Sequence, residues 1–188
     1  MKIQLYKFNR EIFNYPKSDN PKKSLQFAIA INEAMRLLTK AFNTGNIKPL
    51  RDYRNQSKTH SLTLKFINNA EKIACQEYSQ PLKSLKLYST DFIINLREKE
   101  IQIPFNCLID YNNKKMIVLT FGRADNIQQE ITVLLSFVNN FQTTKQWPNE
   151  IKHICYWSLM YGTKFCAIPK NIKPIDKQIL LKTAVNFK

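Results

Sequence analysis

Residues 85–121 read LKLYSTDFIINLREKEIQIPFNCLIDYNNKKMIVLTF, and their apolar side chains recur at every second position. The alternation is clearest at the odd-numbered positions Ile101, Ile103, Phe105, Cys107 and Ile109. A period of two is typical of a strand with one apolar face. The stretch therefore predicts three consecutive strands, at residues 85–96, 100–109 and 115–121. Asn112-Asn113 suits the second turn, because Asn tolerates positive φ better than most residues.

The sequence on both sides of this stretch changes to helical spacing. Helices are predicted at residues 24–42, ended by Gly45, at residues 59–78, and from about residue 126 onward. We also expect a short strand at residues 2–8, a hairpin of residues 154–161 and 164–168 about Gly162, and a terminal helix with Pro174 in its first turn. The predicted fold class is mixed α+β (α/β), with a three-stranded central meander and a further hairpin, flanked by helices.

Residues 46–58, NIKPLRDYRNQSK, are polar, basic and contain a proline. This composition indicates a linker or an exposed loop that faces nucleic acid. It divides the chain into residues 1–58, with the N-terminal strand, helix and basic linker, and residues 59–188, with the main α/β core and the C-terminal helix.

The chain is strongly basic, with 29 Lys and Arg against 14 Asp and Glu and a formal net charge of +15. Residues 1–60 carry 12 basic and 4 acidic groups, and residues 131–188 carry 8 and 2, whereas the middle part is nearly balanced. Such flanks attract a polyanion, because each phosphate that they neutralise releases counterions. We therefore expect nucleic acid, DNA or RNA, as partner. The alternative is a solvated Lys-rich surface that reflects an AT-rich coding sequence.

The expected phosphate contacts lie in the basic linker and after the third strand: Lys48, Arg51, Arg54, Lys58 and Arg123. Arg123 precedes a predicted helix, whose N-terminal backbone N–H groups also favour anions.

Several other classes of protein are excluded by what the sequence lacks. Four widely separated cysteines without a CxxC pair predict reduced thiols rather than a zinc site, and hence a reducing, intracellular compartment. No apolar run is long enough for a membrane span, and the N-terminus has no signal-peptide core. Three glycines are too few for a phosphate-cradling loop of the P-loop or dinucleotide type.

Two polar residues stand at positions that carry a resemblance. His60 opens the predicted helix in THSLTLKFINNAEKI, and Asp110 ends the predicted strand IQIPFNCLID. From His60 to about Phe165 the chain resembles the RecB-like branch of the PD-(D/E)XK nucleases, whose core is a helix, three strands, a crossing helix and a further strand. The resemblance implies a restriction-endonuclease-like core, with His60 and Asp110 in its catalytic site and Asp110 as a metal ligand.

The chain departs from this family in the third strand, KKMIVLTFGRADN. Thr120 and Gly122 stand where the family has an acid and a Lys, and Asp125 lies beyond the strand. Because two carboxylates are needed to hold the divalent cation that activates water, the resemblance implies lost or reduced catalysis. Mg²⁺ is expected as cofactor only if the protein is active.

Three functions stay open at this point. The first is a nucleic-acid-binding protein with a degenerate nuclease core, and the second is a non-catalytic structural or adaptor subunit of a nucleoprotein assembly, with protein partners. The third is an active metal-dependent nuclease that uses Asp110 with Asp125; Glu100 begins the strand that Asp110 ends, about 33 Å away, so these two cannot share a metal. Each site residue also has a plainer interpretation: His60 and Asp125 as polar residues at helix starts, and Asp110 as a turn residue.

Overall fold

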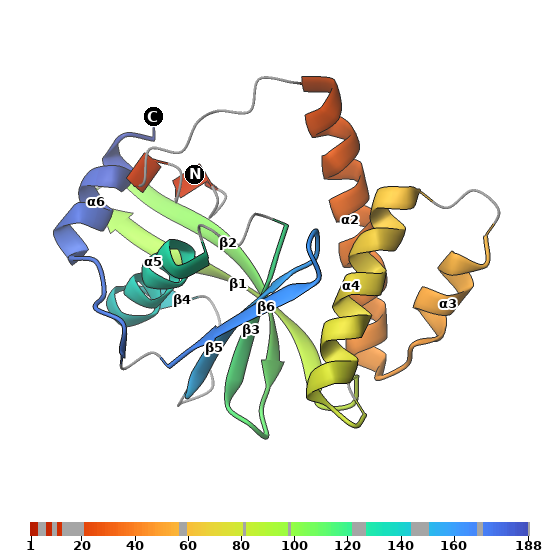
Figure 1. Ribbon diagram of the computed structural model, residues 1–188. Coiled ribbons are helices and arrows are strands. Elements are labelled where there is room, and N and C mark those ends of the chain that lie inside the picture. The colour runs from red at the N-terminus through yellow and green to blue at the C-terminus, as the bar shows by residue number, and fades with distance from the viewer. Residues whose placement is uncertain are drawn as a thin grey trace.

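The computed structural model describes residues 1–3, 7–8, 11–12, 21–56, 60–80, 82–97, 99–121, 127–143, 151–168 and 171–187. Its main helices are α2 (Pro21–Thr44), α3 (Lys48–Arg54), α4 (Ser61–Glu77), α5 (Ile127–Asn140) and α6 (Lys177–Val185). Its strands are β1 (Leu85–Leu96), β2 (Lys99–Asp110), β3 (Lys115–Thr120), β4 (Gln142–Thr143), β5 (His153–Ser158) and β6 (Thr163–Ala167). Helices cover both faces of the sheet: α2, α3 and α4 lie on one side, and α5 and α6 on the other (Figure 1).

The described strands form one six-stranded sheet in the order β4-β1-β2-β3-β5-β6. β1, β2 and β3 are an antiparallel meander. β5 pairs with β3 in parallel, which requires a crossover, and α5 lies in that connection. β6 returns antiparallel to β5 and forms an edge of the sheet. The mixed α+β fold, the meander and the further hairpin that the sequence predicts are therefore confirmed.

Each face of the sheet has its own apolar core. The odd-numbered side chains of β2 from Ile101 to Ile109 are buried and pack in one cluster with α5 and α6. Leu108, Ile117 and Trp157 point to the opposite face and pack with α2, α3 and α4. This division follows from the alternation of side chains along a strand, and it confirms the alternation on which the strand prediction depends.

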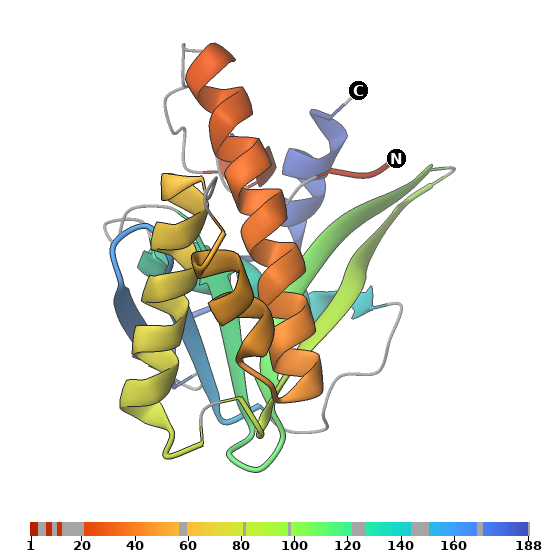
Figure 2. The same ribbon diagram turned by 90° about the vertical axis from the view of Figure 1, so that its right-hand side faces the viewer.

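The basic segment after Gly45 is not the exposed loop that we expected. Residues 48–54 form α3, which has Pro at the start of the helix and buries Leu50 and Tyr53. Proline suits the first turn, where the backbone N–H has no intrahelical acceptor. α3 is the helix farthest from the sheet and lies against α2 and α4 (Figures 1 and 2). Its apolar residues belong to the same core cluster as those of α2, α4 and the sheet.

Two smaller predictions are also corrected. Of the strand expected at residues 2–8, the described residues show a bridge between Lys2 and Gln102, whereas residues 7–8 are helical. Pro174 precedes the terminal helix, which begins after Asp176, whose side chain accepts a hydrogen bond from the Gln178 N–H. The buried face of α2 combines small and large residues, namely Ala30, Ala34, Leu37, Leu38, Ala41 and Phe42, while Leu25 and Ile29 are exposed.

The cysteines differ from the expectation of four reduced thiols. Cys155 of β5 and Cys166 of β6 stand opposite each other in the ladder and form a disulfide, while Cys75 and Cys107 are free. The sequence did not reveal this pair, because its proximity depends on the register of the hairpin. Among the described residues, no helix combines the length and the apolar character needed to cross a membrane.

Candidate functional site

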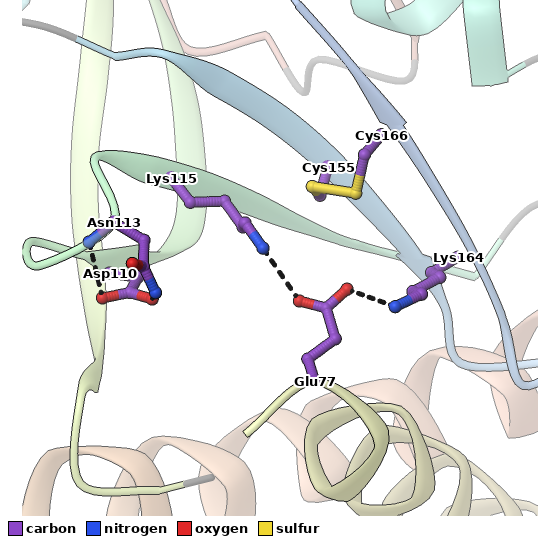
Figure 3. Close-up of polar contacts among 7 residues, drawn as sticks. All are labelled: Glu77, Asp110, Asn113, Lys115, Cys155, Lys164 and Cys166. Carbon is purple, nitrogen blue, oxygen red and sulfur yellow. Dashed lines mark hydrogen bonds and ion pairs between the residues drawn. A yellow bond between two sulfur atoms is a disulfide. The ribbon is translucent and has the colours of Figure 1, made fainter. Parts of the chain in front are cut away.

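The most densely charged part of the described interior lies where the C-terminus of α4 meets the sheet. Glu77 receives the Lys115 ammonium of β3 at 3.1 Å on one carboxylate oxygen and the Lys164 ammonium of β6 at 2.8 Å on the other (Figure 3). The Glu77 side chain is only 5% exposed. We call these three residues the Glu77 cluster. The cluster ties α4 to two strands, and each ion pair neutralises a charge whose burial would otherwise be costly.

Asp110 lies nearby, at the end of β2, and is fully buried. Its Oδ1 accepts hydrogen bonds from the backbone N–H groups of Asn112 and Asn113, at 3.2 and 3.3 Å. Its Oδ2 accepts one from the Asn113 side-chain amide at 2.9 Å (Figure 3). Asp110 therefore fixes the turn between β2 and β3, the role that its position before Tyr111-Asn112-Asn113 also suggested.

Tyr78 directly follows α4 and lies beside these charged groups. Its buried hydroxyl has no hydrogen-bond partner among the described residues. Burial, and then the nearby Asp110 carboxylate, raise the pKa of Tyr78, so the phenol stays protonated at neutral pH. The Lys115 ammonium lies 5.7 Å from the centre of the Tyr78 ring, a favourable cation–π distance. Both oxygens of Glu77 and both oxygens of Asp110 therefore have partners within the protein, while Lys164 still reaches solvent.

The arrangement does not fit a magnesium site. A hard divalent cation needs several oxygen ligands that face it. The Glu77 oxygens already face two ammonium groups, which would repel a cation, and the Asp110 oxygens accept three N–H groups. Nowhere in the described part of the chain do three His, Cys, Asp or Glu residues converge on a possible metal position.

His60 lies at the other end of α4, as the residue that precedes the helix. Its side chain makes no capping hydrogen bond, and its backbone N–H donates to the Tyr53 hydroxyl at 3.3 Å. It lines an open cavity of about 510 Å³ with residues of α2, α3 and α4, including Glu33, Arg36 and Thr63. Glu33 and Arg36 form a two-point ion pair there.

The structure does not bring the predicted catalytic residues together. α4 is 17 residues long, so His60 and the region of Asp110 are separated by about 25 Å along the helix. Asp110 pairs with Lys115 at the start of β3, whereas Thr120, at the position of the family's acid, ends that strand. Glu100 lies at the opposite end of β2 from Asp110, as expected. Asp125 lies outside the described residues.

The predicted phosphate contacts divide into three groups. Lys48 and Arg51 are exposed on α3. Arg54 is half-buried and pairs with Glu71 of α4, so its charge is already matched. Lys58 and Arg123 lie outside the described residues.

Sequence reasoning missed two further exposed cations, Lys65 and Lys72 of α4. The exposed positions of this helix recur at helical spacing and form one stripe opposite the buried face: Ser61, Lys65, Asn68, Lys72, Cys75 and Gln76. The seven-residue spacing of the two lysines, set against the apolar periodicity, is the signal that could have identified them. The Glu77 cluster had no such signal, since its members come from three elements far apart in the sequence.

Compared with family models, with curated proteins and with solved structures, the chain matches none.

Proposed function

We propose that the protein binds nucleic acid through the exposed cations of its α3–α4 surface and does not cleave it by metal-dependent chemistry. We call Lys48, Arg51, Lys65 and Lys72 the basic face. The main support for the proposal is a difference in ion pairing on this side of the sheet, where, among the described residues, most acids have a partner and these cations do not. In the described part of the chain, none of the four has an ion-pair partner, and all are exposed.

The acids of α2, α3 and α4 are mostly engaged in ion pairs. Glu33 pairs with Arg36, Glu71 with Arg54, and Glu77 with two lysines. Asp52 of α3 is the exception, as it is exposed. An unmatched positive surface attracts phosphates, and ion pairs within the protein do not weaken that attraction.

The four cations are presented by adjacent helices. The Arg54–Glu71 pair joins α3 to α4, and the two helices lie side by side (Figure 2). Lys65 and Lys72 are two helical turns apart, about 10 Å, which is within reach of neighbouring phosphates on one strand. The formal charge of +15 adds long-range attraction.

The resemblance to RecB-like nucleases supports the same proposal, because the elements α4, β1, β2, β3, α5 and β5 follow the order of that core. The non-catalytic part of the proposal depends on the engaged oxygens of Glu77 and Asp110. A structural or adaptor subunit of a nucleoprotein assembly is the second candidate, and the same basic face would serve there for an acidic partner.

The test is fluorescence anisotropy of labelled single- and double-stranded DNA and RNA in a salt series. We expect binding that weakens steeply with salt. The double variant Lys48→Ala, Arg51→Ala should lower the slope of log K against log salt by about 1.5, since two phosphate contacts are lost. The matched control is Lys173→Ala, Lys182→Ala, which removes two exposed charges near or on α6.

Absence of binding at low salt would refute the proposal that the basic face binds nucleic acid. An equal loss of affinity and salt dependence in both double variants would refute it too. Mg²⁺ or Mn²⁺ in the same samples tests cleavage. Metal-dependent cutting that Asp110→Ala abolishes would show that the site is rearranged and active.

A further inference from the structure

The turn between β5 and β6 presents an aromatic side chain beside the basic stripe of α4. Tyr161 stands in this turn and is 51% exposed. The chain reverses through Gly162, whose positive φ of 65° closes the turn, and the Gly162 N–H donates to the Ser158 carbonyl at 2.8 Å. The exposed ring is therefore attached to an ordered turn and not to a loose end.

Asn69 of α4 holds this turn in place. Its side-chain amide donates to the Leu159 carbonyl at 2.7 Å. The fit is close at the turn itself, because a Cβ on Gly162 would lie 2.8 Å from the Asn69 Oδ1. A side chain at this position would be strained by the left-handed backbone and would require Asn69 to shift, so glycine is favoured and the turn packs closely on α4.

Asn69 lies between the two lysines of the stripe, four residues after Lys65 and three before Lys72. Residues at these spacings are neighbours on a helix surface. The turn with Tyr161 therefore contacts α4 at a helix position between two exposed lysines. An exposed ring and exposed lysines around one such contact are the elements of a site for a base and its flanking phosphates.

We propose that Tyr161, with Lys65 and Lys72, makes this surface a binding site for single-stranded nucleic acid, in which a base stacks on the tyrosine and the adjoining phosphates contact the lysines. The inference depends on the proposed function and specifies its substrate. A duplex offers the same phosphates, but its bases are stacked on each other and are not free to stack on a side chain. Single strands should therefore bind more tightly than duplexes of the same sequence.

The experiment compares two tyrosines of equal exposure. Tyr111, 52% exposed in the turn between β2 and β3, is the matched control for Tyr161. Tyr161→Ala should weaken the binding of a labelled 12-nucleotide single strand by about 5- to 100-fold and leave duplex binding unchanged. Tyr161→Phe, which keeps the ring, should retain the affinity, and Tyr111→Ala should bind like the wild type. Urea midpoints establish that each variant folds.

The two proposals fail in different ways. If the wild type binds nucleic acid but Tyr161→Ala changes single-strand affinity less than twofold, or if Tyr111→Ala has the same effect, the stacking site is refuted while the basic face stands. If duplex affinity equals or exceeds single-strand affinity, the stacking site is also refuted. If no nucleic acid binds at low salt, both proposals fall.

Discussion

The two faces of the sheet each hold a carboxylate that is at least half-buried, but they surround it with different partners. On the α4 face Glu77 is nearly fully buried and is neutralised by Lys115 and Lys164. On the α5 face Glu130 is half-buried and has no ion pair among the described residues, and burial raises its pKa to about 7. It lies near the buried hydroxyl of Tyr156, which also lacks a hydrogen-bond partner in the described part of the chain.

Removing a charge from water is unfavourable, and a protein can compensate for it by ion pairing or by protonation. The α4 face supplies partners from two strands, so its carboxylate stabilises the fold as an anion. On the α5 face no cation of the described residues pairs with Glu130, so this carboxylate is best tolerated in the neutral form. Replacing each residue should therefore change stability in opposite directions at alkaline pH.

A large effect is expected from Glu77→Ala. This change leaves two ammonium groups facing each other without an anion, and should lower the free energy of unfolding by about 2–3 kcal/mol, a moderate value because Lys164 reaches solvent. Urea unfolding at pH 7 measures it. Glu33→Ala is the control, because it removes one carboxylate from an exposed pair and should cost less than about 1 kcal/mol. Equal losses would contradict the special role of the Glu77 cluster.

The cysteines also differ between the two faces of the sheet. Cys155 and Cys166 are cross-linked, whereas Cys107, on the α5 face, is a buried free thiol. A dithiol reductant should lower the free energy of unfolding by about 3 kcal/mol, as expected for a loop closed over 11 residues. Cys166→Ser should show the same loss and no further response to reductant. Thiol titration of the unfolded, unreduced chain should find two free thiols; four would refute the disulfide.

The third effect concerns Glu130, is a gain rather than a loss of stability on substitution, and depends on pH. Its pKa is about 7 in the folded protein and near 4.5 in the unfolded chain, so the folded state binds the proton more tightly between these values. Stability from this group is fully present below pH 4.5 and falls as pH rises to 7, by at most about 1.4 kcal/mol per pH unit. Glu130→Gln should remove this dependence and be more stable than the wild type at pH 8. A constant difference between the two from pH 4.5 to 8 would contradict the shifted pKa.

The sequence was most informative where a local period coincided with burial. The alternation in β2 and the apolar face of α4 are each visible in a dozen residues, and both were predicted. α3 was not, because Pro49 and its charges suggested a loop, while the helix depends on Leu50 and Tyr53 packing into the core of the helices around it. A local sequence pattern cannot show that residues distant in the chain will pack against a short helix and stabilise it.

The candidate site was less predictable than the fold. Asp110 was identified, and the contacts that its carboxylate makes are with the turn that follows β2. Glu77 and Lys115 are 38 residues apart, and only the packing of α4 on the sheet brings them together. The position of Tyr161 on α4 likewise depends on Asn69, which no motif marks.

The parallel pairing of β3 with β5 has a consequence for how the chain folds. The β1–β2–β3 meander joins neighbours in sequence, so it closes only short loops. β5 can join only after the chain has crossed the sheet through α5, which makes this the slow, non-local step. Because the β5–β6 turn comes with β5, we expect the surface around Tyr161 to be assembled last during refolding. Binding of single-stranded nucleic acid should then recover with the slowest phase of refolding, after most of the secondary structure has formed.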